Sequence, residues 1–249
     1  MGQTGRDGIA AIAVMAKAPQ AGRTKTRLVP PLDAPGAAAL GAAFLRDTTE
    51  NIALVARDMQ VAGGIAYAPA ETQALFDGML APGTFLLLAD GSPAMSPQVQ
   101  GLGRSLFHAV SSLLLEGYGA AVLLNADSPN LPTEYLRRAV AALATGGDRL
   151  VLGPAEDGGY YLVGMTAPHA ALFEDIAWST DQVAAQTRAR AGVLGLDVIE
   201  LPAWYDVDDR VSLDRFIEEL RAPLPGAYAA PATAACLARM NLVSGIVVR

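Results

Sequence analysis

The sequence predicts an α/β protein with a mostly parallel β-sheet flanked by helices. Short apolar runs alternate along the chain with alanine- and leucine-rich segments of helical length, which is the pattern of repeated β-α units. Aromatic residues make up only 6% of the chain, which suits helices packed closely on a sheet better than a β-sandwich. A chain of 249 residues can bury the core of one large domain, and two small domains are the alternative.

Seven short apolar runs are the predicted strands: residues 9–16, 60–67, 84–88, 120–125, 150–153, 160–165 and 197–201. The first run is too short to span a membrane and is not followed by a signal-peptidase-like site. We therefore expect it to be a strand and not a targeting segment.

The segments between these runs are the predicted helices: residues 35–57, 70–79, 102–116, 133–144, 181–191 and 211–220. We expect Thr133, directly after Pro132, to cap the fourth of them. A segment rich in Pro and Gly, residues 222–231, precedes an alanine-rich tail that we expect to pack as an extra helix. The predicted organisation is a domain of residues 1–221 with an extension, 222–249, packed on it. The loop 83–101 contains Pro, Gly and Ser and is of the kind that borders active sites.

Composition excludes several classes of protein. The formal net charge of −7 argues against a broad nucleic-acid-binding surface, which needs an extended basic face. Cys236 is the only cysteine, and His108 and His169 are the only histidines, so neither a disulfide framework nor a zinc site of Cys/His type is possible. No other segment approaches the length of a membrane-spanning helix, and we expect a cytoplasmic protein.

Four cations gather in a short segment after the first predicted strand: Lys17, Arg23, Lys25 and Arg27. Residues 8–32 contain no acidic side chain, although the whole chain is acidic. Uncompensated cations beside a glycine repel one another unless they hold an anion, and phosphate is the obvious candidate. The alternative is a solvated basic loop, which is what most short charge clusters are.

Acidic residues follow predicted strands at three places. Asp127 ends one strand, Glu156 and Asp157 follow another, and Asp206 and Asp208 lie before the last helix. Ligands of open α/β sheets bind at the carboxyl ends of the strands, so acids at these positions favour a site. Asp206 and Asp208 are two residues apart, so in an extended segment both would face one shared cation.

Oxygen ligands without soft neighbours select Mg²⁺ or Mn²⁺, which would in turn bind a diphosphate held by the basic loop. Taken singly, each acid could instead be a turn or cap residue. The glycines Gly158 and Gly159 fit a tight hairpin and a ligand contact equally well.

Other phosphate-binding and catalytic motifs are incomplete. The segment from Gly22 to Lys25 resembles part of a Walker A loop but lacks its leading glycine, which argues against a P-loop NTPase. The segment from Gly101 to Arg104 lacks the third glycine of a dinucleotide fingerprint. No Gly-x-Ser-x-Gly elbow supports a serine hydrolase.

Six segments together resemble one family, the bacterial transferases of the glycosyltransferase-A (GT-A) type that are associated with arsenosugar biosynthesis, also called radical-SAM/selenodomain-associated transferases. The matching segments are Lys17-Ala-Pro-x-x-Gly-Arg-x-Lys-Thr-Arg-Leu28, Gly101-Leu-Gly-Arg104, Asn125-Ala-Asp-Ser-Pro129, Gly153-Pro-Ala-Glu-Asp-Gly-Gly-Tyr-Tyr-Leu162, Trp178-Ser-Thr180 and Asp206-Val-Asp208. In this order and spacing they are specific for the family, though not for one reaction.

The resemblance implies a Rossmann-like nucleotide-diphospho-sugar transferase fold in one domain, with a mixed sheet. By similarity, the nucleotide phosphates would be held by Lys17, Gly22, Arg23, Lys25, Arg27 and Arg104. Asp127 would carry the metal, Mg²⁺ or Mn²⁺, in the manner of an Asp-x-Asp site, and Asp208 would complete it. Asp157 would complete the ion or face the acceptor, and further acceptor contacts would come from Glu156, Gly158, Gly159 and Trp178.

The sequence also departs from the family pattern. Asn125 and Ser128 stand where the family more often has glycine and cysteine, and Asp209 replaces a usual threonine. Gly101 precedes Leu102 where an acid is common. These departures affect the expected acceptor and metal set more than the fold.

The resulting expectation is a metal-dependent glycosyltransferase that moves a sugar from a nucleotide diphosphate sugar to a small acceptor, with Asp157 as the base if the reaction inverts. A nucleotidyltransferase, which joins an NTP to a phosphorylated small molecule and releases pyrophosphate, is the first alternative. The second is a degenerate protein that only binds nucleotides.

Overall fold

The computed structural model describes residues 6–91 and 95–243. Their centre is a seven-stranded sheet with the order β3-β2-β1-β4-β6-β5-β7. Its strands are β1 (Ala10–Ala16), β2 (Val61–Tyr67), β3 (Phe85–Leu88), β4 (Ala120–Leu124), β5 (Arg149–Pro154), β6 (Tyr160–Met165) and β7 (Asp197–Glu200). All seven predicted strands are therefore present, with ends that differ by at most one residue.

The sheet is mostly parallel, and β6 is its one antiparallel member among the described strands, pairing with β4 and β5. The chain passes from β1 outward to β2 and β3 and then returns to form β4 on the other side of β1. This reversal opens a crevice at the carboxyl ends of β1 and β4, which is where open α/β sheets bind ligands.

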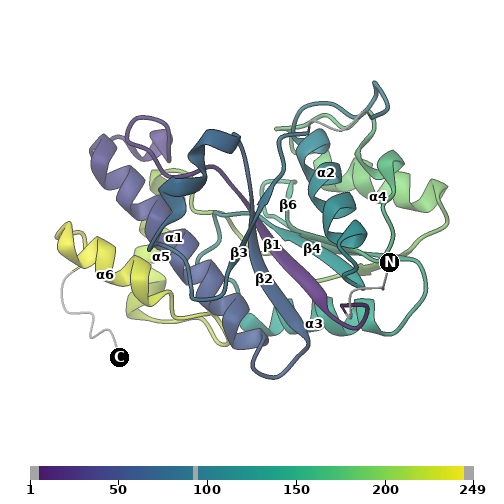
Figure 1. Cartoon of the computed structure of the whole chain (residues 1–249). Coiled ribbons are helices and arrows are strands. Elements are labelled where there is room, and N and C mark those ends of the chain that lie inside the picture. The colour runs from purple at the N-terminus through teal and green to yellow at the C-terminus, as the bar shows by residue number, and fades with distance from the viewer. Residues whose placement is uncertain (1–5, 92–94, 244–249) are drawn as a thin grey trace.

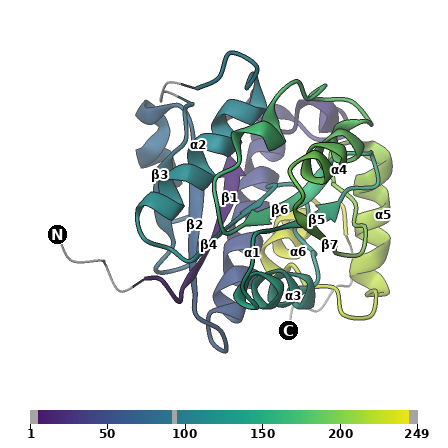
Figure 2. The same cartoon turned by 90° about the vertical axis from the view of Figure 1, so that its right-hand side faces the viewer.

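Helices cover both faces of the sheet (Figures 1 and 2). One face carries α1 (Ala34–Val55), α3 (Thr133–Ala144), α5 (Arg210–Arg221) and α6 (Pro231–Arg239), and the other carries α2 (Leu102–Leu115) and α4 (Val183–Val193). Three short 3-10 helices lie in the connections: Thr26–Leu28, Ala70–Phe76 and Ala170–Phe173. The predicted α/β class with a mixed, mostly parallel sheet is confirmed.

The two faces explain why the central strands β1 and β4 are apolar without interruption. In β1, Ile12 and Val14 face the cluster under α1, α3 and α5, whereas Ala11 and Ala13 face the cluster under α2. Successive side chains of a strand point to opposite faces, so a strand covered on both sides has no polar positions. The small side chains of Ala11 and Ala13 let the helices of that face lie close to the sheet.

Three local predictions are corrected. The predicted helix 70–79 is a 3-10 helix that ends at Phe76. Thr133 does not cap α3, because Pro132 is the N-cap residue and the Thr133 hydroxyl donates instead to Asn51 Oδ1 of α1, at 2.6 Å. The predicted tail helix is α6, which ends at Arg239, and residues 244–249 of that prediction lie outside the described residues.

The C-terminal helix is attached to α1 by a buried carboxylate. Asp47 accepts hydrogen bonds from the backbone N–H groups of Ala232 (2.9 Å) and Thr233 (2.7 Å) and from the Thr233 hydroxyl (2.6 Å). Asp47 therefore satisfies the free N–H groups of the first turn of α6 from a different helix.

Among the described residues, no helix combines the length and the apolar character needed to cross a membrane.

Candidate active site

A pocket of about 310 Å³ lies at the carboxyl ends of β1 and β4. It is lined by the end of β1, the loop that follows it, one turn of α1, the loop after β4 and the segment before α5. Six of the predicted site residues line it: Lys17, Arg23, Lys25, Arg27, Asp127 and Asp208. The structure therefore brings the basic loop and the strand-end carboxylates together, as expected from the position of the crevice in the sheet.

The loop after β1 owes its shape to a few local features. Gly22 has a φ of +76°, which favours glycine, and its Cα faces open space. The Gln20 N–H donates to the Thr24 hydroxyl at 2.9 Å, which closes the turn. The loop rests on α1 at Gly41, where an added Cβ would lie 2.6 Å from the Thr24 methyl group. Gly41 therefore lets the loop lie directly on the helix backbone.

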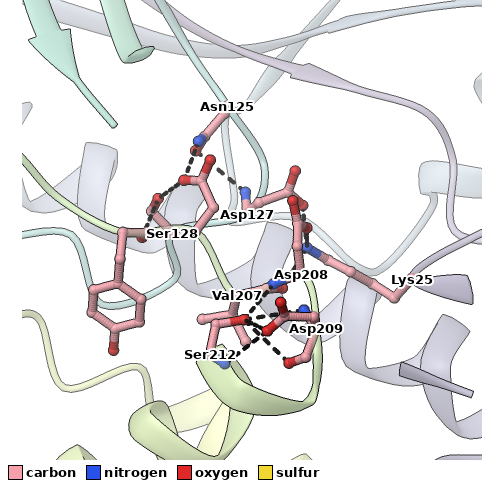
Figure 3. Close-up of polar contacts among 10 residues, drawn as sticks. Lys25, Asn125, Asp127, Ser128, Val207, Asp208, Asp209 and Ser212 are labelled. Carbon is pink, nitrogen blue, oxygen red and sulfur yellow. Dashed lines mark hydrogen bonds and ion pairs between the residues drawn. The ribbon is translucent and has the colours of Figure 1, made fainter. Parts of the chain in front are cut away.

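Lys25 points toward the carboxylates of Asp127 and Asp208 (Figure 3). Its ammonium group contacts Oδ1 of Asp127 and lies 2.8 Å from Oδ1 of Asp208 and 2.8 Å from the Val207 carbonyl oxygen. The Phe44 ring lies beneath it at 4.9 Å, a distance suited to a cation–π contact. Three oxygens and one aromatic face thus enclose a single charge, and the Lys25 side chain is only 7% exposed.

The pKa values of Lys25 and Asp127 depend on the charges that surround them. Burial lowers the pKa of Lys25, but the neighbouring Asp127 and Asp208 outweigh this, so the net pKa is raised and Lys25 stays protonated. Burial raises the pKa of Asp127, with Lys25 opposing and Asp208 adding to this effect. Asp127 is therefore a carboxylate whose charge relies on a cation beside it.

Lys17, Arg23 and Arg27 differ from Lys25, because none of the three makes an ion pair or side-chain hydrogen bond with a described residue. All three side chains line the pocket and belong to exposed residues. Cations left unpaired around a concave surface are typical of anion-binding sites. The chain has only two lysines, Lys17 and Lys25, and both lie in this loop.

Asp206 has a different role from the one predicted. Its Oδ1 accepts hydrogen bonds from Asn125 Nδ2 (2.5 Å) and the Ser128 hydroxyl (2.7 Å), so Asp206 connects the loop after β4 to the segment before α5. The cation shared by two acids is Lys25, and its partners are Asp127 and Asp208, not Asp206 and Asp208. Burial raises the pKa of Asp206 to about 6.

Asp209 is a helix cap. Its side chain accepts from the backbone N–H of Ser212 at 2.8 Å, and the Ser212 hydroxyl accepts from the backbone N–H of Asp209 at 3.0 Å. This reciprocal arrangement is a capping box, and Ser212 three residues later was its signal in the sequence. Asp209 stands where the family resembled above usually has threonine, which is also a favoured cap residue.

The predicted acceptor residues between β5 and β6 do not line the pocket. Glu156 pairs with Arg215 of α5 at 2.7 Å, and Asp157 is exposed, with its Oδ1 accepting from the Gly159 N–H at 2.9 Å. Gly158 has a φ of +91°, and an added Cβ there would lie 2.2 Å from the Asp181 carbonyl oxygen. The glycine pair is thus explained by a tight turn packed on the segment before α4.

This turn nevertheless lies at the same edge of the sheet as the pocket. β5 runs antiparallel to β6, and β6 runs antiparallel to β4, so β4 and β5 end at the same edge. Two strand positions separate β5 from β4, which corresponds to about 10 Å. Asp157 therefore follows a strand that ends at the same edge of the sheet as the pocket.

Trp178 and Arg104 also lie outside the pocket lining. The Trp178 ring packs on the glycines that begin α2, since a Cβ at Gly103 would lie 2.9 Å from its Cζ2. Arg104 donates to the carbonyl oxygen of Gly91, within the 83–101 loop, at 2.8 Å, and residues 92–94 of this loop lie outside the described part. His108 accepts from the Gly91 N–H at 3.0 Å and supports the same loop.

The oxygen atoms of Asp127, Asp208 and the Val207 carbonyl, which we call the acidic wall, suit a hard divalent ion. Two carboxylates and a backbone carbonyl converge on the Lys25 nitrogen. Mg²⁺ in particular is held by one or two carboxylates together with substrate phosphates, not by a complete protein cage. The described residues contain no group of three or more His, Cys, Asp or Glu side chains placed to hold a metal, so such an ion would need oxygens from water or a ligand.

A smaller pocket of about 170 Å³ adjoins the first one, with which it shares Met15, Ala16 and Lys17. Its other walls come from the ends of β2 and β3 and the start of α2, and they are mainly apolar. Together the two pockets offer a charged half and an apolar half, meeting at Lys17.

Sequence reasoning missed several residues and contacts of this site. Gly41 and Leu45 of α1 line the pocket, and the sequence named Asn125, Ser128 and Asp206 without predicting that they contact one another. Gly41 carried a signal, because a glycine inside a helix lowers its stability unless close approach is needed. The contacts of Asp206 with Asn125 and Ser128 had no signal, since these residues are far apart in the chain.

Comparisons with known proteins agree with the fold. A structure from Desulfovibrio desulfuricans G20, provisionally described as a nucleotide-diphospho-sugar transferase, superposes with a TM-score of 0.76 at 25% identity, over 95% of this chain and 99% of that chain. A comparison with curated proteins finds no match.

Two further structures share the fold at lower identity. A CMP:2-keto-3-deoxy-manno-octonic acid synthetase complexed with CTP has a TM-score of 0.52 at 12% identity, over 87% and 100% of the two chains. A 4-diphosphocytidyl-2C-methyl-D-erythritol synthase from Anaerococcus prevotii DSM 20548 has a TM-score of 0.51 at 10% identity, over 86% and 100%.

A family model matches residues 51–180, which is more than half of the chain. The protein therefore belongs to the DUF2064 family, described as uncharacterized and conserved in bacteria, and its fold is that of the nucleotide-diphospho-sugar transferases.

Proposed function

We propose that the protein is a transferase that uses a nucleotide-activated donor, and that it moves a sugar from a nucleotide diphosphate sugar to a small acceptor. One observation carries this proposal: unpaired cations of the loop after β1 face two strand-end carboxylates across one pocket. Cations on one side of the pocket and carboxylates on the other suit a diphosphate with a bound divalent ion. The similarity at 25% identity to a provisionally described nucleotide-diphospho-sugar transferase supports the same reading.

In this proposal the basic loop holds the diphosphate. Lys17, Arg23 and Arg27 donate to its oxygens and stabilise the negative charge that grows as it leaves. Gly22 supplies the turn that presents Arg23, and Arg104 acts from the first turn of α2. The nucleoside extends into the adjoining apolar pocket beyond Lys17.

Asp127 and Asp208 would hold Mg²⁺ or Mn²⁺. A bound ion of this kind supplies positive charge to the leaving diphosphate. The chain's own contribution is to hold both carboxylates at one point, through the Val207 N–H that donates to the Asp127 carbonyl oxygen at 2.8 Å.

Asp157 is the proposed base. It removes the proton from the acceptor hydroxyl, whose oxygen forms a bond to the anomeric carbon while the bond from that carbon to the phosphate oxygen breaks. The acceptor lies on the open side of the pocket, near Glu156, Gly158, Gly159 and Trp178. We propose that this acceptor is a small molecule, as the resemblance to the arsenosugar-associated transferases implies.

The first alternative is a nucleotidyltransferase. The same cations would hold a triphosphate, and the bond that breaks would be that between the α- and β-phosphates. Release of pyrophosphate from CTP, GTP or UTP, with a phosphorylated small molecule present, would favour this reaction. A protein that only binds nucleotides is the second alternative, and unchanged nucleotide affinity in Asp127→Ala without turnover on any donor would favour it.

Calorimetric titration with UDP-, GDP- and CDP-sugars, each with and without Mn²⁺, tests the proposal. We expect binding of at least one donor that is strengthened by Mn²⁺. Absence of binding to all of them under both conditions would contradict the proposed function.

A further inference from the structure

The point where a divalent ion would sit is taken by the protein's own cation. The Lys25 ammonium group touches Asp127 and Asp208 and donates to the Val207 carbonyl oxygen, so it uses the same three oxygens that a hard ion would use. An ammonium group and a metal ion cannot share this point. Lys25 and the ion are therefore mutually exclusive in this position.

The charges of Asp127 and Asp208 favour exchange of the Lys25 ammonium group for a divalent ion. With Lys25 in place, the two carboxylates and one ammonium group carry a net charge of −1, whereas a divalent ion would neutralise the pair. Without either cation, the two carboxylates would face each other at close range and repel. The acidic wall thus requires a cation at all times, and Lys25 supplies it when no ion is bound.

The Lys25 side chain is enclosed, but the loop that carries it lies at the surface. In this loop after β1, the neighbouring Gly22 and Arg23 are exposed. The Lys25 side chain lines the same pocket as Arg23, and a lysine is a point charge on a flexible four-carbon stem. Rotation of this stem can turn the ammonium group from the carboxylates toward the unpaired cations without disturbing the core.

We propose that Lys25 is a placeholder cation: a divalent ion that binds Asp127 and Asp208 displaces its ammonium group, which then joins Lys17, Arg23 and Arg27 in holding phosphate. This inference rests on the proposed function for the identity of the ligand. It adds that metal binding and phosphate binding are coupled through one side chain. The phosphate-binding wall is thus complete only once the ion is in place.

The chain allows a direct test, because its only two lysines are the buried Lys25 and the exposed Lys17. Reductive methylation of the intact wild-type protein, followed by peptide mass spectrometry, gives the labelling rate of each. Without metal we expect Lys25 to react far more slowly than Lys17. Millimolar Mg²⁺, without any nucleotide, should raise the Lys25 rate about tenfold and leave Lys17 unchanged. Equal rates without metal, or a Lys25 rate that Mg²⁺ does not change, would overturn the inference.

A second measurement uses Mn²⁺ binding, followed by electron paramagnetic resonance without nucleotide. Lys25→Met removes the competitor, so we expect it to bind Mn²⁺ about tenfold more tightly than the wild type. Arg23→Met removes a charge from the same loop without touching the carboxylates, and it should change the affinity far less. Equal or weaker binding by Lys25→Met would also overturn the inference. The proposed function is tested separately by donor titration, so the two can fail independently.

Discussion

Lys25 Nζ, in the loop after β1, lies 2.8 Å from Asp208 Oδ1, just before α5. This contact joins segments separated by 183 positions in the chain. The Val207 N–H also donates to the Asp127 carbonyl oxygen, so the loops after β1 and β4 and the segment before α5 form one connected wall. The site is therefore part of what holds these three loops together.

Replacing Lys25 by methionine should destabilise the protein when no metal is present. Asp127 and Asp208 would face each other without a cation, and loss of one partner of a buried ion pair is costly. Because these carboxylates are 36% and 39% exposed, we expect a loss of about 1–3 kcal/mol in the free energy of unfolding, measured in urea. The exposed Lys17→Met is the control and should change it by less than about 0.5 kcal/mol. A Lys25→Met protein as stable as the wild type would contradict this account of the wall.

Arg23→Gln should weaken donor binding without affecting the fold. Arg23 lines the pocket and has no ion-pair partner among the described residues, so its charge is available to phosphate. Loss of one charge-assisted hydrogen bond should weaken affinity about tenfold, measured by calorimetry at low salt. Arg57→Gln removes another exposed arginine, in the turn after α1, and should leave affinity unchanged. Equal effects of the two changes would indicate general electrostatic attraction and not a phosphate contact.

The sequence predicted the sheet well because its signals are local. An apolar run without polar positions indicates a strand that is covered on both faces, and β1 is such a strand. The crevice followed from the strand-end position of Asp127. The predicted helix 70–79 was wrong because apolar content alone does not separate an α-helix from a 3-10 helix.

The internal contacts of the site were beyond sequence reasoning. The sequence predicts a set of four equivalent cations in the basic loop, yet Lys25 alone turns inward, from a left-handed backbone conformation with φ 49° and ψ 42°. Nothing in the residue pattern distinguishes it from Arg23. Asp206 was paired with Asp208 by spacing, but its partners, Asn125 and Ser128, lie about eighty positions away. Tertiary packing decided both outcomes.

Gly41→Ala should separate stability from binding. Alanine favours the interior of α1 by up to about 1 kcal/mol, but its Cβ would lie 2.6 Å from the Thr24 methyl group and push the basic loop outward. We expect donor affinity to fall at least about threefold while the free energy of unfolding changes by less than about 1 kcal/mol. Gly192→Ala in α4, where an added Cβ meets nothing within 4 Å, is the matched control and should not change affinity. Unchanged affinity in Gly41→Ala would show that the loop moves aside without consequence.

Asp157→Asn should reduce turnover without reducing donor affinity. Asp157 is exposed and does not line the pocket, so its proposed role concerns the acceptor proton and not the nucleotide. Loss of a general base should lower kcat about a hundredfold or more, while the calorimetric Kd for the donor stays within about twofold. Asp77→Asn is the control, because it removes an exposed carboxylate that has no role in the proposed site. A fall in donor affinity with unchanged kcat would exclude Asp157 as the base.

Asp47 should make stability decrease as the pH rises. Burial raises the pKa of Asp47 to about 6 from the model-peptide value of 3.8, against the opposing hydrogen bonds from Thr233 and Ala232. The folded protein therefore binds more protons than the unfolded chain between these two values, so this contribution to the free energy of unfolding falls as the pH rises toward 6 and is level above it. The difference corresponds to at most about 3 kcal/mol. Urea unfolding from about pH 4.5 to 7.5 should show a flatter pH dependence in Asp47→Asn than in the wild type. The control is the exposed Asp58→Asn, which should retain the pH dependence of the wild type. If Asp47→Asn also retained the wild-type pH dependence, Asp47 would titrate normally and its charged and neutral forms would hold α6 equally well.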